Sequence, residues 1–163
     1  MPTREPHDAV MIRQATIDDA PAISAIVIRT LRETNAKFYA AEMIETVVAN
    51  FSVDRVEARM AERVVLVATI AGIVVGTASL HQTTVRTVFV SPDRQGQRIG
   101  ATLMARILDI AREQGLDSLT VPSAINAEPF YRKLGFRSIQ DKIEDAGRII
   151  IMSKTLVPAD ERN

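Results

Sequence analysis

Residues 88–103 read VFVSPDRQGQRIGATL, a stretch that passes from an apolar strand through a polar turn directly into an amphipathic helix. The first N–H groups of a helix have no partner within it and lie at the positive end of the helix dipole, so an anion placed there is stabilised twice. Gly96 lets the turn adopt a positive φ, and Gly100 leaves no Cβ between the first helical turn and a bound group. The junction predicts a phosphate site, although an ordinary strand-to-helix turn with a packing glycine would use the same residues.

The glycine spacing excludes two better-known phosphate motifs. It is not G-x-G-x-x-G, because Gly96 and Gly100 are the only glycines within residues 88–103 and lie four apart. It is not a P-loop, because no Gly-Lys-Ser/Thr follows. Residues 95–100, QGQRIG, instead resemble the acyl-CoA loop of the Gcn5-related N-acetyltransferase (GNAT) family, with the pattern Gln or Arg, two residues, Gly, one residue, Gly or Ala. This chain has Arg98 at the first glycine position. Because such a loop acts through backbone N–H groups, an outward Arg98 could add a contact to a phosphate.

The composition is that of one ordinary globular domain. A chain of 163 residues with 47% apolar and 25% charged residues can bury a single core of normal size. Twenty basic residues balance twenty acidic ones, so the net charge predicts neither nucleic-acid nor membrane binding.

The sequence offers no metal site, disulfide or membrane segment. Cysteine is absent, and His7 and His81 have no partner at ligand spacing, so we expect no metal. Residues 1–8 contain no apolar stretch typical of a signal peptide, and the most apolar region, residues 64–76, is too short to span a bilayer. We therefore expect a cytoplasmic protein.

The pattern of apolar residues, caps and turns predicts an α+β (mixed α/β) fold, a central mixed twisted sheet flanked by helices. We expect strands at 10–14, 64–70, 73–81, 83–90 and 119–121, helices at 18–33, 43–48, 56–60, 99–113 and 126–134, and a closing hairpin of 136–143 and 148–154 around Asp145-Ala146-Gly147. This order resembles that of the GNAT family from Val10 to Lys154. We expect one N-acetyltransferase domain at 10–157, between a flexible N-terminus at 1–9 and a tail at 158–163.

A second segment, residues 126–136, reads NAEPFYRKLGF and resembles the family segment in which an Asn opens a helix and a Tyr faces the acetyl-CoA sulfur. From the residues alone, Asn126 suits a helix N-cap, Phe130 and Leu134 a core face, and Gly135 a C-cap. These roles explain every residue but Tyr131. A Tyr with a pKa of about 10 can protonate a departing thiolate, so the resemblance implies Tyr131 as the general acid.

The resemblance implies acetyl-CoA as co-substrate, direct attack of an amine on the thioester, and no metal. The residues it places at the cofactor are Phe89, Val90, Gln95, Gly96, Gln97, Arg98, Ile99, Gly100, Ala101, Asn126 and Lys133.

The chain departs from the family where many relatives carry a base. Four and six residues before Val90, where they have Glu or His, it has Arg86 and Thr84, which strict alternation puts on one face with Val88 and Val90. Neither accepts a proton from an ammonium. Glu33 and His81 are alternative bases, although Glu33 also suits a solvated helix end and His81 a strand terminus.

Fewer residues predict where the acceptor amine binds than where acetyl-CoA binds. Arg86 could bind an acid on the acceptor or simply pair with a structural carboxylate. The connector with Phe38 and Tyr39, together with Phe51, lies where the family forms the wall of the acceptor site, and simple packing explains Phe38 and Phe51 equally well.

The resulting interpretation is that the protein acetylates the nitrogen of a small-molecule amine or amino acid. We expect no nucleic-acid or membrane partner, and a homodimer is possible. Acetylation of a protein amine, N-terminal or lysine, and an acetyl-CoA-sensing module with little turnover remain the alternatives.

Overall fold

The computed structural model of the chain describes residues 9–144 and 147–156. Most of the predicted N-terminal segment, the tail at 158–163, and the turn residues Asp145 and Ala146 lie outside the described residues. The division of the chain at 1–9, 10–157 and 158–163 therefore stays a prediction.

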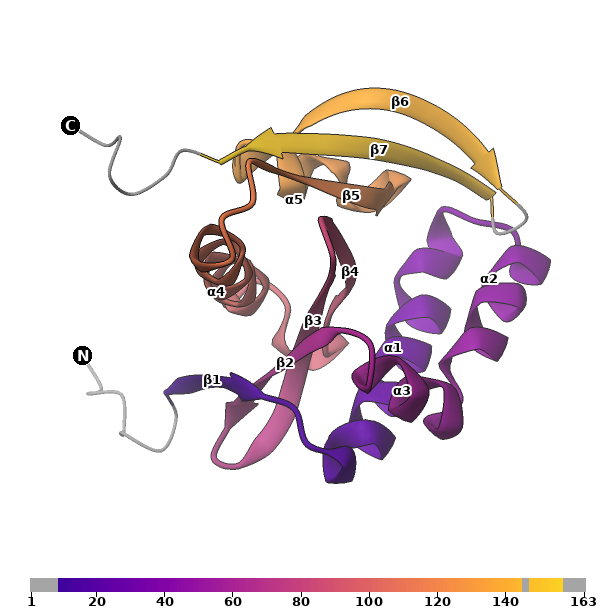
Figure 1. The fold of residues 1–163 in the computed structure, drawn as a ribbon. Coiled ribbons are helices and arrows are strands. Elements are labelled where there is room, and N and C mark those ends of the chain that lie inside the picture. Colours follow the sequence, from indigo (N-terminus) through magenta and orange to yellow (C-terminus); the bar gives the residue numbers. More distant parts are fainter. Residues whose placement is uncertain (1–8, 145–146, 157–163) are drawn as a thin grey trace, which may run out of the picture.

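Seven strands form one mixed sheet in the order β1-β2-β3-β4-β5-β7-β6 (Figure 1). The strands are β1 (Val10–Gln14), β2 (Val64–Ile70), β3 (Ile73–His81), β4 (Thr84–Val90), β5 (Ser118–Ala124), β6 (Arg137–Glu144) and β7 (Gly147–Thr155). The helices are α1 (Ala20–Glu33), α2 (Ala41–Val48), α3 (Val53–Met60), α4 (Ile99–Glu113) and α5 (Glu128–Lys133). The predicted mixed α/β fold, a central sheet flanked by helices, is confirmed.

Helices cover both faces of the sheet, and each face has its own apolar core (Figure 1). On one face, Leu103 and Ile107 of α4 pack in a core with Leu66 of β2. On the other, Val27 of α1 packs in a core with Val67, the next residue of the same strand. Because β2 is buried on both sides, its sequence is a continuous apolar run instead of an alternating one.

The strands β4 and β5 are parallel neighbours that diverge after their first contact (Figure 1). The registered pair is Thr84 with Thr120, and the Thr120 amide donates to the Thr83 carbonyl at 3.0 Å. From Val85 to Val90, no residue of β4 pairs with β5 within the described chain. One edge of β4 is therefore left without a strand partner just before the loop at 95–101.

A β-bulge at Thr87 interrupts the strict alternation of side chains that was expected for β4. The pairing with β3 shifts between Thr77 and Ser79, and Thr87 has a φ of +50°. The extra residue reverses the alternation beyond it. Val88 and Val90 consequently pack toward α4, whereas Arg86 pairs with Ser79 on the opposite face, so the expectation that they share one face is wrong.

Candidate active site

The loop between β4 and α4 presents a run of unpaired backbone N–H groups. A short 3-10 turn (Pro92–Arg94) follows β4, Gly96 has a φ of +81°, and Arg98 precedes α4 with a φ of +66°. Within the described residues, none of the amides of residues 95–101 donates a hydrogen bond to the protein. Successive amides in turns with left-handed residues form an anion-binding concavity, here joined to a helix N-terminus.

Gly100 allows a close approach between three elements. A Cβ at this position would lie 3.2 Å from the ring of Phe130 in α5 and 3.6 Å from the side chain of Val90. The sequence predicted that Gly100 leaves space for a bound group, but the Phe130 ring lies against the same position. Gly100 joins the start of α4 to α5 and to the end of β4.

The end of β4 is held from two sides. The Thr30 hydroxyl of α1 donates to the Val90 carbonyl at 3.3 Å, and the side-chain Nε2 of Gln95 donates to the same oxygen at 3.5 Å. Phe89 turns toward the other face, where its ring meets that of Phe51 edge-on at 6.2 Å. The side chain of Ile99 is buried in the core, whereas Gln97 and Arg98 are exposed.

Asn126 does not cap a helix, contrary to the N-cap interpretation. It lies within a 3-10 turn (Ile125–Ala127), and Ala127 precedes α5 as the cap residue without a side-chain hydrogen bond. The Asn126 Oδ1 atom is buried and has no hydrogen-bond partner. A buried acceptor left unpaired costs about 1–3 kcal/mol, so an N–H group of a ligand would be stabilised there.

Tyr131 lies in the α4-side core with Val85 of β4 and Val121 of β5, the two strands that diverge. Its side chain is only 5% exposed and packs edge-on against Phe130 at 5.0 Å and Phe136 at 5.7 Å. Burial raises the pKa of Tyr131 well above its ordinary value. The hydroxyl is therefore protonated at neutral pH. Lys133, two residues further along α5, is exposed.

The predicted acceptor residues lie on two walls. Thr84 and Arg86 line a shallow pocket at the start of the β4–β5 divergence, and the Thr84 hydroxyl lies 3.3 Å from that of Thr120. Glu144 of β6 is the carboxylate in this pocket, and it pairs with Lys142 at 3.3 Å.

The second wall is the connector between α1 and α2. The Tyr39 hydroxyl donates to the Arg148 carbonyl at 2.6 Å and accepts from the Ile125 amide at 2.8 Å. Burial raises the pKa of Tyr39. This side chain therefore joins the connector to the end of β5 and the start of β7, beside Asn126. Phe38 is 51% exposed.

Residues 35–156 match the family model described as the acetyltransferase (GNAT) domain. The chain belongs to the GNAT family. It is an acetyl-CoA-dependent N-acetyltransferase, and the resemblance inferred from its two motifs is confirmed.

The GNAT match extends to individual proteins. The chain is 27% identical over 139 residues to an uncharacterised N-acetyltransferase, YafP, of Escherichia coli K12, covering 85% of this chain and 89% of YafP. It resembles a GCN5-related N-acetyltransferase from Rhodopseudomonas palustris, with a TM-score of 0.85, 26% identity, and coverage of 94% and 100%. The PaiA N-acetyltransferase of Thermoplasma acidophilum, solved in complex with coenzyme A, shares the fold at a TM-score of 0.77, 19% identity, and coverage of 90% and 99%.

Neither alternative base of this GNAT domain lines the Thr84 pocket. Glu33 pairs with Arg29 at 3.0 Å. His81 is the partner of Thr84 in the β3–β4 register, and its ring lies 3.3 Å from the Glu62 carbonyl. Among residues 9–144 and 147–156, no group of three or more His, Asp or Glu side chains is placed to hold a metal ion. None of the helices described is long and apolar enough to cross a membrane.

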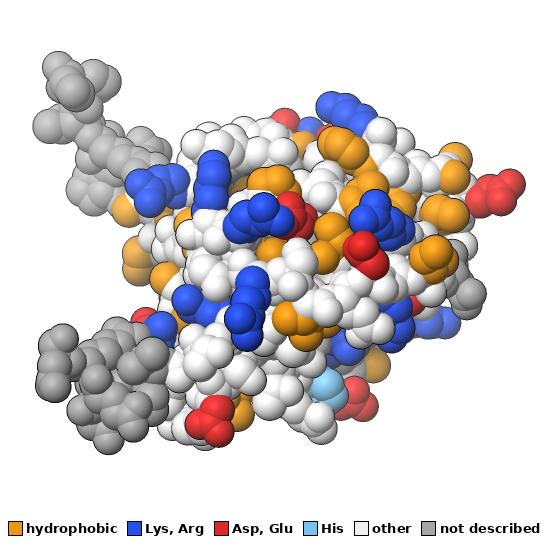
Figure 2. Space-filling model, turned by 90° about the horizontal axis from the view of Figure 1, so that it is seen from above, with side chains coloured by type: hydrophobic (Ala, Val, Ile, Leu, Met, Phe, Trp, Pro, Cys, Tyr) orange, Lys and Arg blue, Asp and Glu red, His pale blue; other side chains and the backbone are white. Residues whose placement is uncertain are grey.

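Two arginines of the GNAT domain were missed by the sequence interpretation. Arg59 and Arg63 line a pocket with Thr87, Ser79 and Phe51. A signal was present, because Arg55, Arg59 and Arg63 recur at a spacing of four with like charge, an arrangement that destabilises a helix unless something else favours it. Elsewhere the two signs mix: Figure 2 shows basic, acidic and apolar side chains interspersed on the face seen from above.

Proposed function

We propose that this GNAT enzyme transfers the acetyl group of acetyl-CoA to the amine of a small molecule or amino acid, with Tyr131 as general acid. The observation that carries the proposal is the run of unpaired amides at 95–101 beside the free edge of β4. That run suits a pyrophosphate, because backbone N–H groups and the N-terminus of α4 both favour negative charge. Arg98 and Lys133, both exposed, are the cations that would contact the phosphates.

The free edge of β4 would receive the pantetheine arm. Residues 85–90 have no partner on β5, so the amide groups of the arm can pair with the backbone near Phe89 and Val90 as an added strand would. The unpaired Asn126 Oδ1 supplies an acceptor for an N–H of the arm. Both features bring the thioester toward the core in which Tyr131 lies.

Tyr131 would complete the reaction by donating its proton to the sulfur. The acceptor nitrogen forms a bond to the thioester carbon, the carbon–sulfur bond breaks, and the thiolate takes the phenolic proton. Tyr131 then recovers a proton released by the amine through water, so the products are an amide and free CoA thiol. Holding both reactants in line supplies much of the rate, because orientation alone is worth roughly 7–11 kcal/mol.

Neither Thr84 nor Arg86 can remove a proton from an ammonium, and the carboxylate that shares their pocket, Glu144, is paired with Lys142. We therefore expect the acceptor to react as the neutral amine, with kcat/KM rising with pH until the acceptor is deprotonated.

Release of CoA thiol from acetyl-CoA, measured against a panel of small amines, amino acids and short peptides, tests the proposal. Turnover of small amines or amino acids is expected. Turnover of the peptides alone would overturn the small-molecule acceptor in favour of a protein amine.

A further inference from the structure

The pocket beneath α3 lies on the face of the sheet that α1 covers, opposite α4. It is a small cavity of about 20 Å³ that opens to solvent, between α3, Phe51 and the strands β2, β3 and β4. Its floor includes Thr77, Ser79 and the bulge residue Thr87. The bulge turns Thr87 and Arg86 toward this side, since Arg86 pairs with Ser79 in the sheet.

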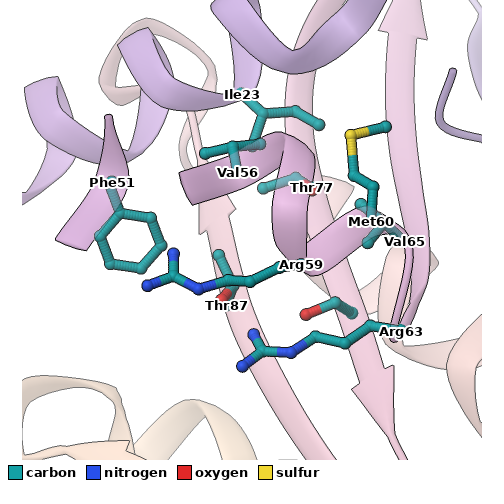
Figure 3. A pocket seen from close by; sticks show the side chains of 10 residues that line it. Ile23, Phe51, Val56, Arg59, Met60, Arg63, Val65, Thr77 and Thr87 are labelled. Atoms are coloured by element: carbon teal, nitrogen blue, oxygen red, sulfur yellow. The ribbon is translucent and has the colours of Figure 1, made fainter. Parts of the chain in front are cut away.

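Two arginines reach into this pocket from the end of α3 and from the turn that follows. Figure 3 shows the guanidinium groups of Arg59 and Arg63 extended in the same direction, with Arg59 between Phe51 and Thr87. The Arg59 guanidinium lies 4.7 Å from the centre of the Phe51 ring, a cation–π contact that orients it. Arg59 Nη1 and Arg63 Nε are buried, and neither donates a hydrogen bond to the protein.

These guanidinium groups lie near other cations, and the Glu144 carboxylate that lines the pocket with Arg86 is paired with Lys142 instead. Among the described residues, Arg59, Arg63 and Arg86 form no ion pair, whereas Arg13, Arg29 and Arg32 each bind a carboxylate with two nitrogens. Burial lowers the pKa of Arg59, and Arg63 and Arg55 lower it further. Burial and Arg86 likewise lower the pKa of Arg63, and only Glu62 opposes this. A bound anion would accept hydrogen bonds from the unpaired N–H groups and would reduce the repulsion between the positive charges.

The position of Arg86 connects this pocket to the proposed reaction site. Arg86 precedes Thr87 and also lines the pocket with Thr84 and Thr120, where β4 and β5 diverge. An anion on Arg59 and Arg63 would therefore lie on the same side of the sheet as an amine directed toward the divergence. We propose that Arg59, Arg63 and Arg86 form an anion-binding subsite that holds a carboxylate or phosphate group of the acceptor amine. This inference rests on the proposed function and names its substrate class.

Matched pairs of amines test the subsite in the complete enzyme. β-Alanine and ethylamine differ by one carboxylate, and phosphoethanolamine and ethanolamine by one phosphate, so the two arms distinguish the kinds of anion. We expect a lower KM for the acidic member of at least one pair. In the double variant Arg59→Gln/Arg63→Gln, KM for that amine should rise roughly 10- to 100-fold, the scale of a lost charge-assisted contact. KM for acetyl-CoA and the rates with neutral amines should stay unchanged.

The control variant is Arg55→Gln, which removes an exposed arginine of the same helix that donates to Asn50 at 2.9 Å and does not line the pocket. Equal KM values for acidic and neutral amines, or an unchanged KM in the folded double variant, would overturn the proposal. If circular dichroism shows that the glutamine pair does not fold, Arg59→Lys/Arg63→Lys keeps the charges, loses the planar forks and should raise KM less.

A binding measurement separates failure of the subsite from failure of the proposed function. If no amine is acetylated, the proposed function fails, and inorganic phosphate is then titrated by calorimetry into wild type saturated with CoA, which occupies the 95–101 loop. Binding that is weakened by the double variant and not by Arg55→Gln supports the subsite. The absence of binding, or equal binding by all three proteins, contradicts it.

Discussion

Arg29 of α1 holds Asp93 in a two-nitrogen ion pair, with distances of 2.8 and 2.9 Å between guanidinium and carboxylate. The pair joins α1 to the turn that opens the 95–101 loop, across 64 positions of sequence. Arg29 holds the pKa of Asp93 below its usual range, so the carboxylate stays charged at neutral pH. The loop is thus tethered to α1 as well as to its own helix.

Loss of this tether should weaken acetyl-CoA binding without unfolding the protein. We expect Arg29→Ala to raise KM for acetyl-CoA a few-fold, because the loop amides lose their preset orientation, while the thermal midpoint hardly changes. Steady-state kinetics at low and high salt provide the measurement, and the difference should narrow at high salt. Arg32→Ala is the control, since Arg32 makes the same kind of pair with Glu45 of α2, away from the loop. An equal effect of both variants would contradict the tether.

A carboxylate at position 100 should abolish CoA binding. Gly100→Glu places a side chain against Phe130 and a negative charge at the N-terminus of α4, where a phosphate is expected. We expect CoA affinity measured by calorimetry to fall at least 100-fold, roughly 2.7 kcal/mol. Ala105→Glu, on the exposed face of the same helix, should bind CoA normally. Unchanged affinity in a folded Gly100→Glu protein would move the site elsewhere.

Substitution of the two tyrosines of the chain should have different effects, one on the catalytic rate and the other on stability. Tyr131→Phe keeps the ring between Phe130 and Phe136 and removes only the hydroxyl, so CoA binding should persist while kcat falls by about 100-fold or more. Pre-steady-state thiol release measures this directly. A loss of a few-fold, with the same pH profile as wild type, would make Tyr131 a packing residue only.

Tyr39→Phe should show the opposite pattern. It leaves the Ile125 amide and the Arg148 carbonyl without their shared partner, which costs about 1–3 kcal/mol of unfolding free energy. Urea unfolding provides the measurement, and kcat should change much less than in Tyr131→Phe. A variant as stable as wild type would show that the connector is held by other contacts.

The Asp19 carboxylate should make stability depend on pH. It accepts from Arg13 at 2.7 and 2.9 Å and from the Thr16 amide at 2.7 Å, and Arg13 is the main cause of its lowered pKa. Because the folded pKa is below the unfolded value of about 4, the stabilisation is complete above that value and is lost as pH falls through the folded pKa. Asp19→Asn should therefore cost about 1 kcal/mol at pH 7 and progressively less as the pH falls through the folded pKa, measured by urea unfolding. Asp18→Asn, at the exposed neighbour, is the control variant.

Local sequence patterns determined most of the elements of this protein. The apolar positions of α4 recur on one face of a helix from Ile99 to Ala111, and Gly115 ends it with a φ of +75° and the expected backbone bonds from Gly115 and Leu116. The 95–101 loop and the segment with Tyr131 are likewise read from neighbouring residues, since caps, glycines and periodicity act over a few positions.

Only the tertiary structure decided which side chains share a face and a pocket. A single extra residue at Thr87 reverses β4, so Arg86 leaves the face of Val88 and joins Arg63, 23 positions away in sequence and carried there by α3. The same holds for the unpaired Oδ1 of Asn126, which a local pattern assigned to a helix cap. Bulges, burial and the absence of a partner depend on what packs across the sheet, and such contacts leave no mark in the spacing of neighbouring residues.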